Sequence, residues 1–236
     1  EYSSSEGDDN AEVMKVASGG SKIWDFSYYV DDERNYQDFF GIEQLETNRF
    51  VVVGQEQING ENWDAIVFKL DSNGEILSQE HYGDSVLDDW FIDVTVTENG
   101  EPVYAGIRNG VYDDEANEYN FYDGWVYYDG STSTWSEEVT IDDLNRFNSI
   151  STDGNRIVAG GVSLVEEGGQ RDGLVVEYGL DGTRNWRLTT DESEDYNIDD
   201  VFVSGNDTYV AGEIYISDSN NFDGSLRKYT TATDSN

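Results

Sequence analysis

Val52-Val53-Gly54 ends a short run of apolar residues. The same three-residue motif, called the cadence below, returns at Tyr104-Ala105-Gly106, Val158-Ala159-Gly160 and Val210-Ala211-Gly212. The four glycines follow one another at intervals of 52, 54 and 52 residues. A repeat of about 50 residues built from strands is typical of a sheet repeated radially around an axis. The cadence therefore predicts a repeat fold, and it leaves the function open.

Each repeat divides into four strands. The first precedes a tight turn, the second carries the cadence, the third opens with an aspartate and a small residue, and the fourth follows a glycine turn. Runs rich in Val, Ile, Tyr and Phe that close on Asn, Asp and Gly are the pattern of strands and turns. We predict an all-β protein, a β-propeller of four-stranded antiparallel blades, as a single domain over residues 10–230. The repeats are expected at about residues 39–82, 90–140, 145–190 and 197–229, between an acidic spacer at 1–9 and a polar tail at 231–236.

The N-terminus holds a further, partial repeat. Residues 10–24 align without a gap on residues 64–78, which carry a third and a fourth strand. We expect four blades, with the ring closed by N-terminal strands within residues 10–29, because open ends would leave unpaired sheet edges. One third strand is then surplus. Either residues 223–229 complete the last blade together with 23–29, or residues 12–16 do so and the C-terminal strand is spare. A fragment of a larger ring is the remaining alternative.

The chain is strongly acidic, with 51 acidic against 13 basic residues and a formal net charge of -38. Such a surface repels nucleic acid and anionic membranes, so neither is expected as a partner. Only Lys15, Lys22, Lys69 and Lys228 are lysines. An acidic, lysine-poor and aromatic-rich composition is typical of salt-loving organisms, where molar salt screens self-repulsion. The lack of cysteine excludes disulfides and Cys nucleophiles, and the lack of a long apolar run argues against membrane insertion.

A longer stretch of the repeat carries a resemblance to a known family. Lys69-Leu70-Asp71-Ser72-Asn73-Gly74, followed by His81-Tyr82-Gly83-Asp84, Asp88-Asp89-Trp90-Phe91 and the cadence at Tyr104, resembles the repeat of the bacterial and archaeal surface β-propellers. The resemblance covers residues 10–229. It implies a propeller displayed outside the cell or anchored at its surface. It implies little about activity, because most members of that family lack a known reaction.

The long connections define a candidate binding face. Alternating strand directions place the connections between repeats, and those between second and third strands, on one rim, and these connections are long and acidic. Function on a rigid scaffold concentrates in such loops. The candidate binding residues are Asp31, Asp32, Tyr36, Asp88, Asp89, Asp113, Asp114, Tyr119, Asp142, Asp143 and Asp195. We expect a non-enzymatic extracellular binding or assembly module whose partner is a protein or a carbohydrate at the cell surface.

Tyrosines on the same loops are a second feature of this rim. Tyr28, Tyr29, Tyr36, Tyr112, Tyr119 and Tyr122 are predicted either to stack on a sugar or protein partner or to pack the loops against the rim.

One segment of the rim approaches a calcium-binding pattern. Asp218, Asn220 and Asp223 approach the Asp-x-Asn spacing of a calcium loop, and Ca²⁺ takes six to eight oxygen ligands. The segment lacks the glycine and the terminal glutamate of a complete loop. A solvated acidic surface is the alternative interpretation of these residues.

Two further function classes stay open. Paired carboxylates suit glycoside hydrolysis, and an acidic propeller offers such pairs by chance, so a carboxylate-based hydrolase is an alternative. His81 is the only histidine, which excludes a multi-histidine metal centre, and we assign no catalytic residue. A structural subunit that assembles through the surplus edge strand is the other alternative.

Overall fold

The structure, a computed structural model, describes residues 11–28, 36–45, 48–57, 62–83, 86–113, 118–141, 144–164, 170–190, 195–216 and 221–230. These residues form 17 strands. No helix in the described part of the chain is long and apolar enough to cross a membrane. The prediction of an all-β protein is confirmed.

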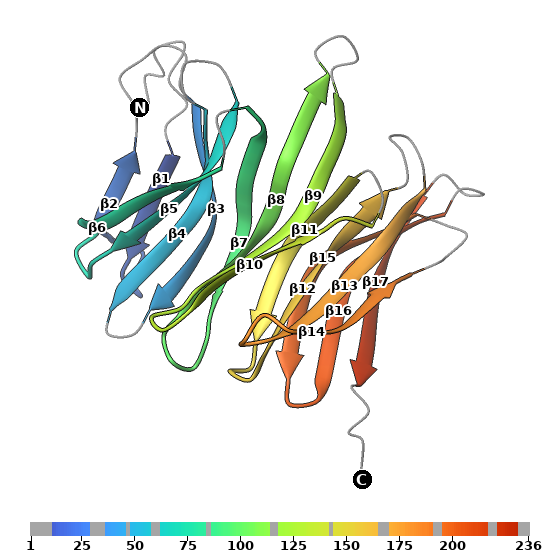
Figure 1. The fold of residues 1–236 in the computed structure, drawn as a ribbon. Coiled ribbons are helices and arrows are strands. Elements are labelled where there is room, and N and C mark those ends of the chain that lie inside the picture. The colour runs from blue at the N-terminus through green and yellow to red at the C-terminus, as the bar shows by residue number, and fades with distance from the viewer. Residues whose placement is uncertain are drawn as a thin grey trace.

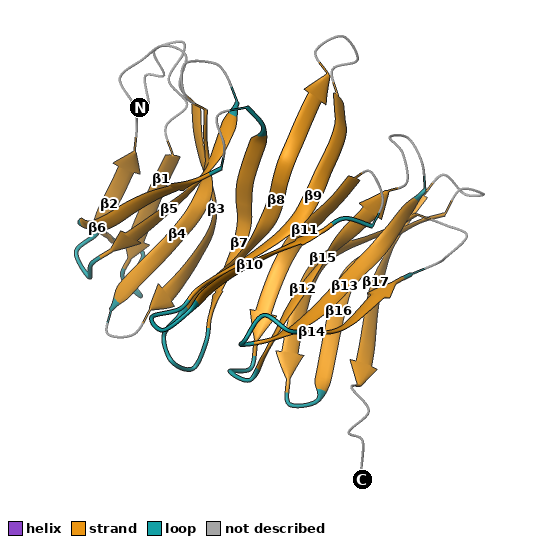
Figure 2. Ribbon diagram, viewed as in Figure 1, coloured by secondary structure: helices purple, strands orange, loops and turns teal. Residues whose placement is uncertain are grey.

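The strands form a series of antiparallel units in chain order, and one parallel pair, Leu144 with Tyr122, connects the second and third units into an eight-stranded sheet (Figures 1 and 2). The N-terminal hairpin consists of β1 (Ala11–Val16) and β2 (Lys22–Tyr28). The first blade consists of β3 (Tyr36–Leu45), β4 (Arg49–Gln57), β5 (Trp63–Leu70) and β6 (Ile76–Tyr82). The second consists of β7 (Asp88–Val96), β8 (Pro102–Asp113), β9 (Glu118–Asp129) and β10 (Thr134–Val139). The third consists of β11 (Leu144–Thr152), β12 (Arg156–Leu164), β13 (Arg171–Gly179) and β14 (Arg184–Thr189). The last sheet holds β15 (Asp195–Ser204), β16 (Asp207–Ile216) and β17 (Asn221–Thr230).

The core lies between these units rather than inside one of them. Middle strands are covered on both faces, so all nine residues of β12 are buried. Between the first two blades, Val53 packs in one cluster with Phe91 and Trp125. Similar clusters fill the junction of the second and third blades, and that of the third blade and the last sheet. Burial at each junction removes apolar surface from water at roughly 25 cal/mol per Å², which holds neighbouring units face to face.

The glycine of the cadence has a steric function that the structure defines. In every first strand a β-bulge follows the residue paired with this glycine, at Phe39, Phe91, Phe147 and Ile198. The partners are Gly54, Gly106, Gly161 and Gly212, and at each one a Cβ would overlap a backbone carbonyl oxygen of the first strand. The equivalent position in the third blade is therefore Gly161, one residue beyond the Gly160 that the sequence cadence selects.

The predicted closure of a four-bladed ring is not formed in this structure. Within the described residues β1 pairs only with β2, and β17 pairs only with β16. The hairpin and the last sheet lie at opposite ends of the row of sheets in Figure 1. The hairpin instead packs on the first blade, where the Phe26 ring lies 5.3 Å from Phe68 and 6.1 Å from Phe39 between centroids. The hairpin corresponds to the third and fourth strands of a repeat, as predicted. It packs against the first blade, however, and does not complete the last one.

Tryptophans on fourth strands join one unit to the next. The indole N–H of Trp24 donates to the Ser72 carbonyl in the first blade at 2.9 Å, and that of Trp135 donates to the Leu180 carbonyl in the third blade at 2.9 Å. Trp186 is the counterpart on the third blade, and its buried indole N–H has no hydrogen-bond partner within the described residues. Leu180 and Ser72 each lie eight residues after the aspartate of their third strand, Asp172 and Asp64. In the last sheet the position eight residues after Asp223 is Thr231, which lies outside the described residues.

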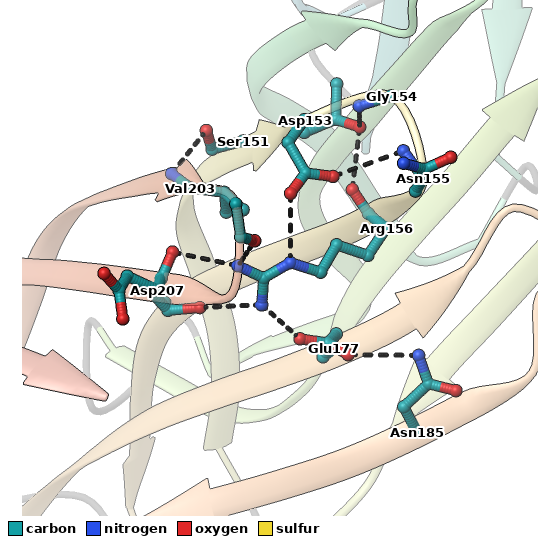
Figure 3. Close-up of polar contacts among 12 residues, drawn as sticks. Ser151, Asp153, Gly154, Asn155, Arg156, Glu177, Asn185, Val203 and Asp207 are labelled. Atoms are coloured by element: carbon teal, nitrogen blue, oxygen red, sulfur yellow. Dashed lines mark hydrogen bonds and ion pairs between the residues drawn. The ribbon is translucent and has the colours of Figure 1, made fainter. Parts of the chain in front are cut away.

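A buried arginine forms an ion pair within the third blade and hydrogen bonds to the last sheet (Figure 3). Arg156 Nη1 lies 2.6 Å from Glu177 Oε2, and Arg156 Nε lies 3.2 Å from Asp153 Oδ2. Nη2 donates to the carbonyls of Gly205 at 2.7 Å and Asp207 at 2.9 Å, in the turn between β15 and β16. Only 9% of Arg156 and 3% of Glu177 are exposed. One guanidinium therefore neutralises a buried carboxylate and fixes the neighbouring sheet.

Candidate functional site

A cavity of about 650 Å³ lies on the rim between the first and second blades. It is bounded by the ends of β4 and β5, by the segment before β7, and by the ends of β8 and β9. Its lining residues are Gln57, Asn62, Trp63, Val86, Leu87, Asp88, Gly110, Val111, Tyr112 and Tyr119. Alternation of strand direction brings these connections to the same rim. Ligand pockets typically measure about 300–1,000 Å³, so the cavity is large enough for a small molecule or a side chain of a partner.

Asp88 anchors the floor of this cavity across the blade junction. Its carboxylate accepts a hydrogen bond from the Trp63 backbone N–H at 2.7 Å and one from the Tyr119 hydroxyl at 2.8 Å. Asp88 is 8% exposed. Burial, followed by the hydrogen bond to Asp88, raises the pKa of Tyr119, so its phenol stays protonated. The two bonds fix the first blade, the carboxylate and the aromatic ring in one geometry.

Aromatic rings form the walls of the cavity and support them. The Tyr112 and Tyr119 rings meet edge to face, with centroids 5.0 Å apart and planes at 64°. Behind them Trp90 lies 5.5 Å from Tyr119. On the other side Tyr36 lies 6.4 Å from Trp63. Tyr112 and Tyr36 are 42% and 38% exposed, so part of this aromatic surface is open to solvent.

Asp89, the neighbour of Asp88, does not line the cavity. It is 1% exposed and accepts a hydrogen bond from the Asn109 backbone N–H at 3.0 Å. Asn109 has a φ of 61°, in the left-handed region, so the carboxylate supports a constrained turn of β8. Arg108 Nε lies 3.9 Å from Asp89, and Arg108 Nη1 lies 2.8 Å from Glu138. The structure places Asp89 among the supports of β8, away from the rim surface.

The other predicted rim residues fall into two groups. Asp195 lies at a different junction, in a cavity of about 220 Å³ with Arg171, Glu213, Tyr215 and Phe222, and accepts a hydrogen bond from the Arg171 backbone N–H. The structure therefore brings Asp88, Tyr119 and Tyr36 together and separates Asp195 from them. Asp113 ends β8. The remaining candidates lie outside the described residues: Asp31, Asp32, Asp114, Asp142 and Asp143.

The calcium hypothesis stays a prediction. Asp218 and Asn220 lie outside the described residues. Asp223 is exposed on β17, where it pairs with Ile214 of β16. Across the ranges that the structure describes, no group of three or more His, Cys, Asp or Glu residues could hold a metal ion.

Carboxylates on the first strands are engaged in bonds between blades. Asp93 of β7 accepts a hydrogen bond from the Ile150 N–H of β11 at 2.9 Å. Ser149 of β11 donates to Asp200 of β15 at 2.8 Å, and its hydroxyl accepts from the Val201 N–H at 3.3 Å. Burial raises the pKa of Asp93. These acids link successive first strands, which gives each of them a structural function.

A second polar cluster links the N-terminal hairpin to the first blade. The Tyr28 hydroxyl of β2 lies 3.3 Å from both carboxylate oxygens of Glu56 on β4, and it accepts a hydrogen bond from Gln79 at 2.8 Å. His81 Nδ1 lies 3.4 Å from Glu56 Oε2. Burial raises the pKa of Glu56 above its ordinary 4.5, against the opposing effects of His81 and the Tyr28 hydrogen bond. Burial and the nearby Glu56 raise the pKa of Tyr28 to about 12.

Replacing Glu56 by glutamine is expected to stabilise the protein at pH 7. A raised pKa favours folding while the carboxyl is protonated, and this contribution is lost as the pH rises through the folded-state pKa. Glutamine keeps an acceptor for Tyr28 without a buried charge. Urea unfolding between pH 4 and 8 should show a gain for Glu56→Gln that disappears below about pH 4.5. Glu12→Gln, at an exposed position on β1, is the matched control. A loss of stability at pH 7 would show that the charge itself holds the hairpin.

Sequence reasoning identified part of this site. It selected Tyr36, Asp88, Tyr112 and Tyr119 because they lie on long or acidic connections. It missed Trp63 and the amides Gln57 and Asn62. Trp63 directly precedes Asp64, which opens a third strand, and this position at a strand start on the rim was the available signal.

The known proteins most useful for comparison are solved structures. No family model matches the chain, and no curated protein matches it. The Neurospora crassa Pan2 WD40 domain is similar over 94% of this chain and 60% of that one, with a TM-score of 0.53 at 15% identity. A cobalt-substituted Synechocystis apocarotenoid oxygenase gives a TM-score of 0.47 at 9% identity over 83% of this chain and 51% of that one. YjhT gives 0.43 at 11% identity over 80% and 66%.

The likeness to the WD40 domain shows the fold alone. The chain has a β-propeller-like, all-β fold, and it spans about 60% of the length of that domain.

Proposed function

We propose that this protein is a non-enzymatic binding module that holds its ligand in the rim cavity between the first and second blades. The observation that supports this proposal is the cavity itself, whose aromatic walls are fixed in place by the Asp88 hydrogen bonds. A preformed pocket with a few oriented polar groups is the usual form of a ligand site. Both oxygens of Asp88 hold protein donors, which suits a supporting carboxylate better than a general acid or a nucleophile.

The binding proposal is tested with one cavity variant and one matched control. A library of small molecules, oligosaccharides and short peptides is screened by chemical-shift changes on the wild-type chain. Tyr112→Ala opens the cavity wall, whereas Tyr215→Ala removes a tyrosine from the smaller cavity near Asp195. We expect ligands whose shifts are lost in Tyr112→Ala and kept in Tyr215→Ala. A screen without hits at the cavity, or hits indifferent to Tyr112→Ala, would contradict the proposal.

We further propose that the module works outside the cell of a salt-loving organism. The formal charge of -38 supports this, because such a chain folds against its own repulsion unless salt screens it. The Debye length falls from about 30 Å at 0.01 M salt to about 3 Å at 1 M. Thermal unfolding should therefore show a midpoint that rises by about 10 °C or more over this range, equivalent to ~3–5 kcal/mol for a chain of this size. A midpoint that is flat across the range would contradict the halophilic assignment.

Assembly through the exposed outer face of the last sheet is a second candidate function, favoured by a separate observation. The outer face of the last sheet exposes Phe202, Phe222 and Leu226 at 60%, 57% and 76%. The buried Trp186 indole at the preceding junction has no partner within the described residues. At the two equivalent junctions the indole N–H of Trp24 or Trp135 donates a hydrogen bond to a turn that leads to a fourth strand. Within the described residues β17 pairs only with β16, so a strand of a second copy that paired with β17 would cover this sheet edge.

Mass measurement in high salt tests the assembly candidate. If a second copy covers the last sheet, the chain should run as an oligomer, and Leu226→Asp should return it to the monomer. Ile76→Asp, at another exposed apolar position, should leave the mass unchanged. A wild-type chain that is monomeric at all concentrations would exclude this function without affecting the binding proposal.

A further inference from the structure

We propose that the rim cavity takes an alkylated ammonium cation, such as the trimethylammonium group of a small molecule. This inference rests on the proposed binding function and specifies the chemical class of its ligand. Three properties of the described cavity residues carry it: the arrangement of their rings, the state of Asp88, and the charges around them.

The rings form the corner of an aromatic cage. Tyr112 and Tyr119 present planes at 64° to each other with centroids 5.0 Å apart, and Trp63 belongs to the same lining. The face of an aromatic ring carries negative electrostatic potential, and cations bind within about 6 Å of a ring centroid. Methyl groups on the cation add apolar contact with these faces and reduce the cost of leaving water. Rings at a steep angle can contact such a rounded cation from two sides.

Asp88 strengthens the cage indirectly, because both of its oxygens accept hydrogen bonds from the protein. The Tyr119 hydroxyl donates to Asp88 at 2.8 Å, which shifts electron density toward the Tyr119 ring and makes its face more attractive to a cation. Asp88 is 8% exposed, so water screens its carboxylate less than it screens a surface charge. The Trp63 N–H holds the second oxygen and keeps the carboxylate in position.

The surrounding charge favours a cation over a neutral or anionic ligand. No lysine or arginine is among the described residues that line the cavity. The nearby cation Arg108 lies 2.8 Å from Glu138 and lies over the Trp125 ring, so its charge is directed elsewhere. At low ionic strength, where the Debye length is about 30 Å at 0.01 M salt, the net charge of -38 adds a longer-range attraction for cations. A neutral sugar could stack on the same rings but would gain nothing from this field.

The test compares choline with dimethylbutanol, its uncharged carbon isostere of nearly the same shape. Both are titrated by calorimetry into the full chain, together with a neutral methyl glucoside. We expect choline to bind at least about tenfold more tightly than dimethylbutanol, since a cation–π contact at a shielded site contributes about 1–2 kcal/mol. Tyr112→Ala should weaken choline binding at least fivefold. Tyr119→Phe keeps the ring but removes the hydrogen bond to Asp88, and should weaken choline more than dimethylbutanol.

Each result distinguishes the ligand class from the function. Equal affinity for choline and dimethylbutanol would overturn the cation, and so would choline binding that Tyr112→Ala leaves unchanged while Tyr215→Ala abolishes it. Binding of the glucoside in the cavity without choline would overturn the cation and keep the binding function. If none of the three probes binds, the cation proposal is also overturned. The screen of small molecules, oligosaccharides and peptides then decides whether the cavity has a binding function. Thermal unfolding of each variant verifies that it is folded.

Discussion

Replacing Arg156 with methionine is expected to lower the free energy of unfolding by about 3–5 kcal/mol, because it leaves a buried carboxylate without its partner. Glu177 is 3% exposed and lies 2.6 Å from the guanidinium. The same change leaves the carbonyls of Gly205 and Asp207 without their donor, which loosens the last sheet. Equilibrium unfolding in urea at fixed salt measures the effect. Arg184→Met, at an exposed position of β14, is the matched control and should change stability by less than about 0.5 kcal/mol.

The double variant Arg156→Met, Glu177→Leu separates a lost charge pair from lost packing. Replacing a whole buried ion pair by apolar residues is often neutral, so the double variant should recover at least half of the loss. A single variant as stable as the wild type would show that Arg156 stabilises neither the buried Glu177 nor the junction with the last sheet. If the double variant loses more stability than the two single variants, Arg156→Met and Glu177→Leu, lose together, the effect is due to packing.

Replacing Gly161 with alanine is expected to cost at least about 3 kcal/mol or to prevent folding, because the new methyl group would overlap the Arg146 carbonyl. Backbone cannot move aside as a side chain can. Gly160→Ala meets mainly the side chain of Val201, so shortening that side chain should relieve it. Urea unfolding should therefore show that Val201→Ala restores part of the stability that Gly160→Ala loses. No change of a nearby side chain should restore the stability of Gly161→Ala.

Gly224→Ala is the control for the glycine prediction. A Cβ at Gly224 has open space within 4 Å, and the residue lies in strand β17. Alanine there should be neutral or stabilise by up to about 1 kcal/mol, because glycine loses more conformational freedom on folding. If Gly161→Ala is tolerated as well as Gly224→Ala, the bulge geometry assigned to the third blade is wrong.

The repeat was predictable from the sequence because strand alternation and turn chemistry are local. The register inside one repeat was not. In the third blade two glycines are adjacent, and only the position of the bulge after Phe147 shows that Gly161 faces the first strand. A one-residue offset changes which face each side chain occupies. The sequence cadence therefore located the strand correctly, and the structure assigns the steric function in the third blade to the glycine one position beyond the cadence.

Closure and the site depend on contacts between distant parts of the chain. Residues 10–24 revealed a third-and-fourth-strand pair, yet nothing local indicated that Phe26 would pack on the first blade instead of leading β2 to β17. For the site, Asp88 and Tyr119 were chosen as rim residues, but their hydrogen bond links positions 31 residues apart. Trp63 becomes part of the cavity only because its N–H meets Asp88 of the next blade. Such pairings require the fold.

The most direct test of the central claim, that the rim cavity binds a cation, is the pattern of NOEs from the methyl protons of choline to the full chain. The proposal predicts contacts with the rings of Trp63, Tyr112 and Tyr119, which line the cavity. These contacts should disappear when Tyr112 is replaced by alanine. Contacts to Tyr215 and Phe222 instead, or no contacts at saturating choline, would contradict it.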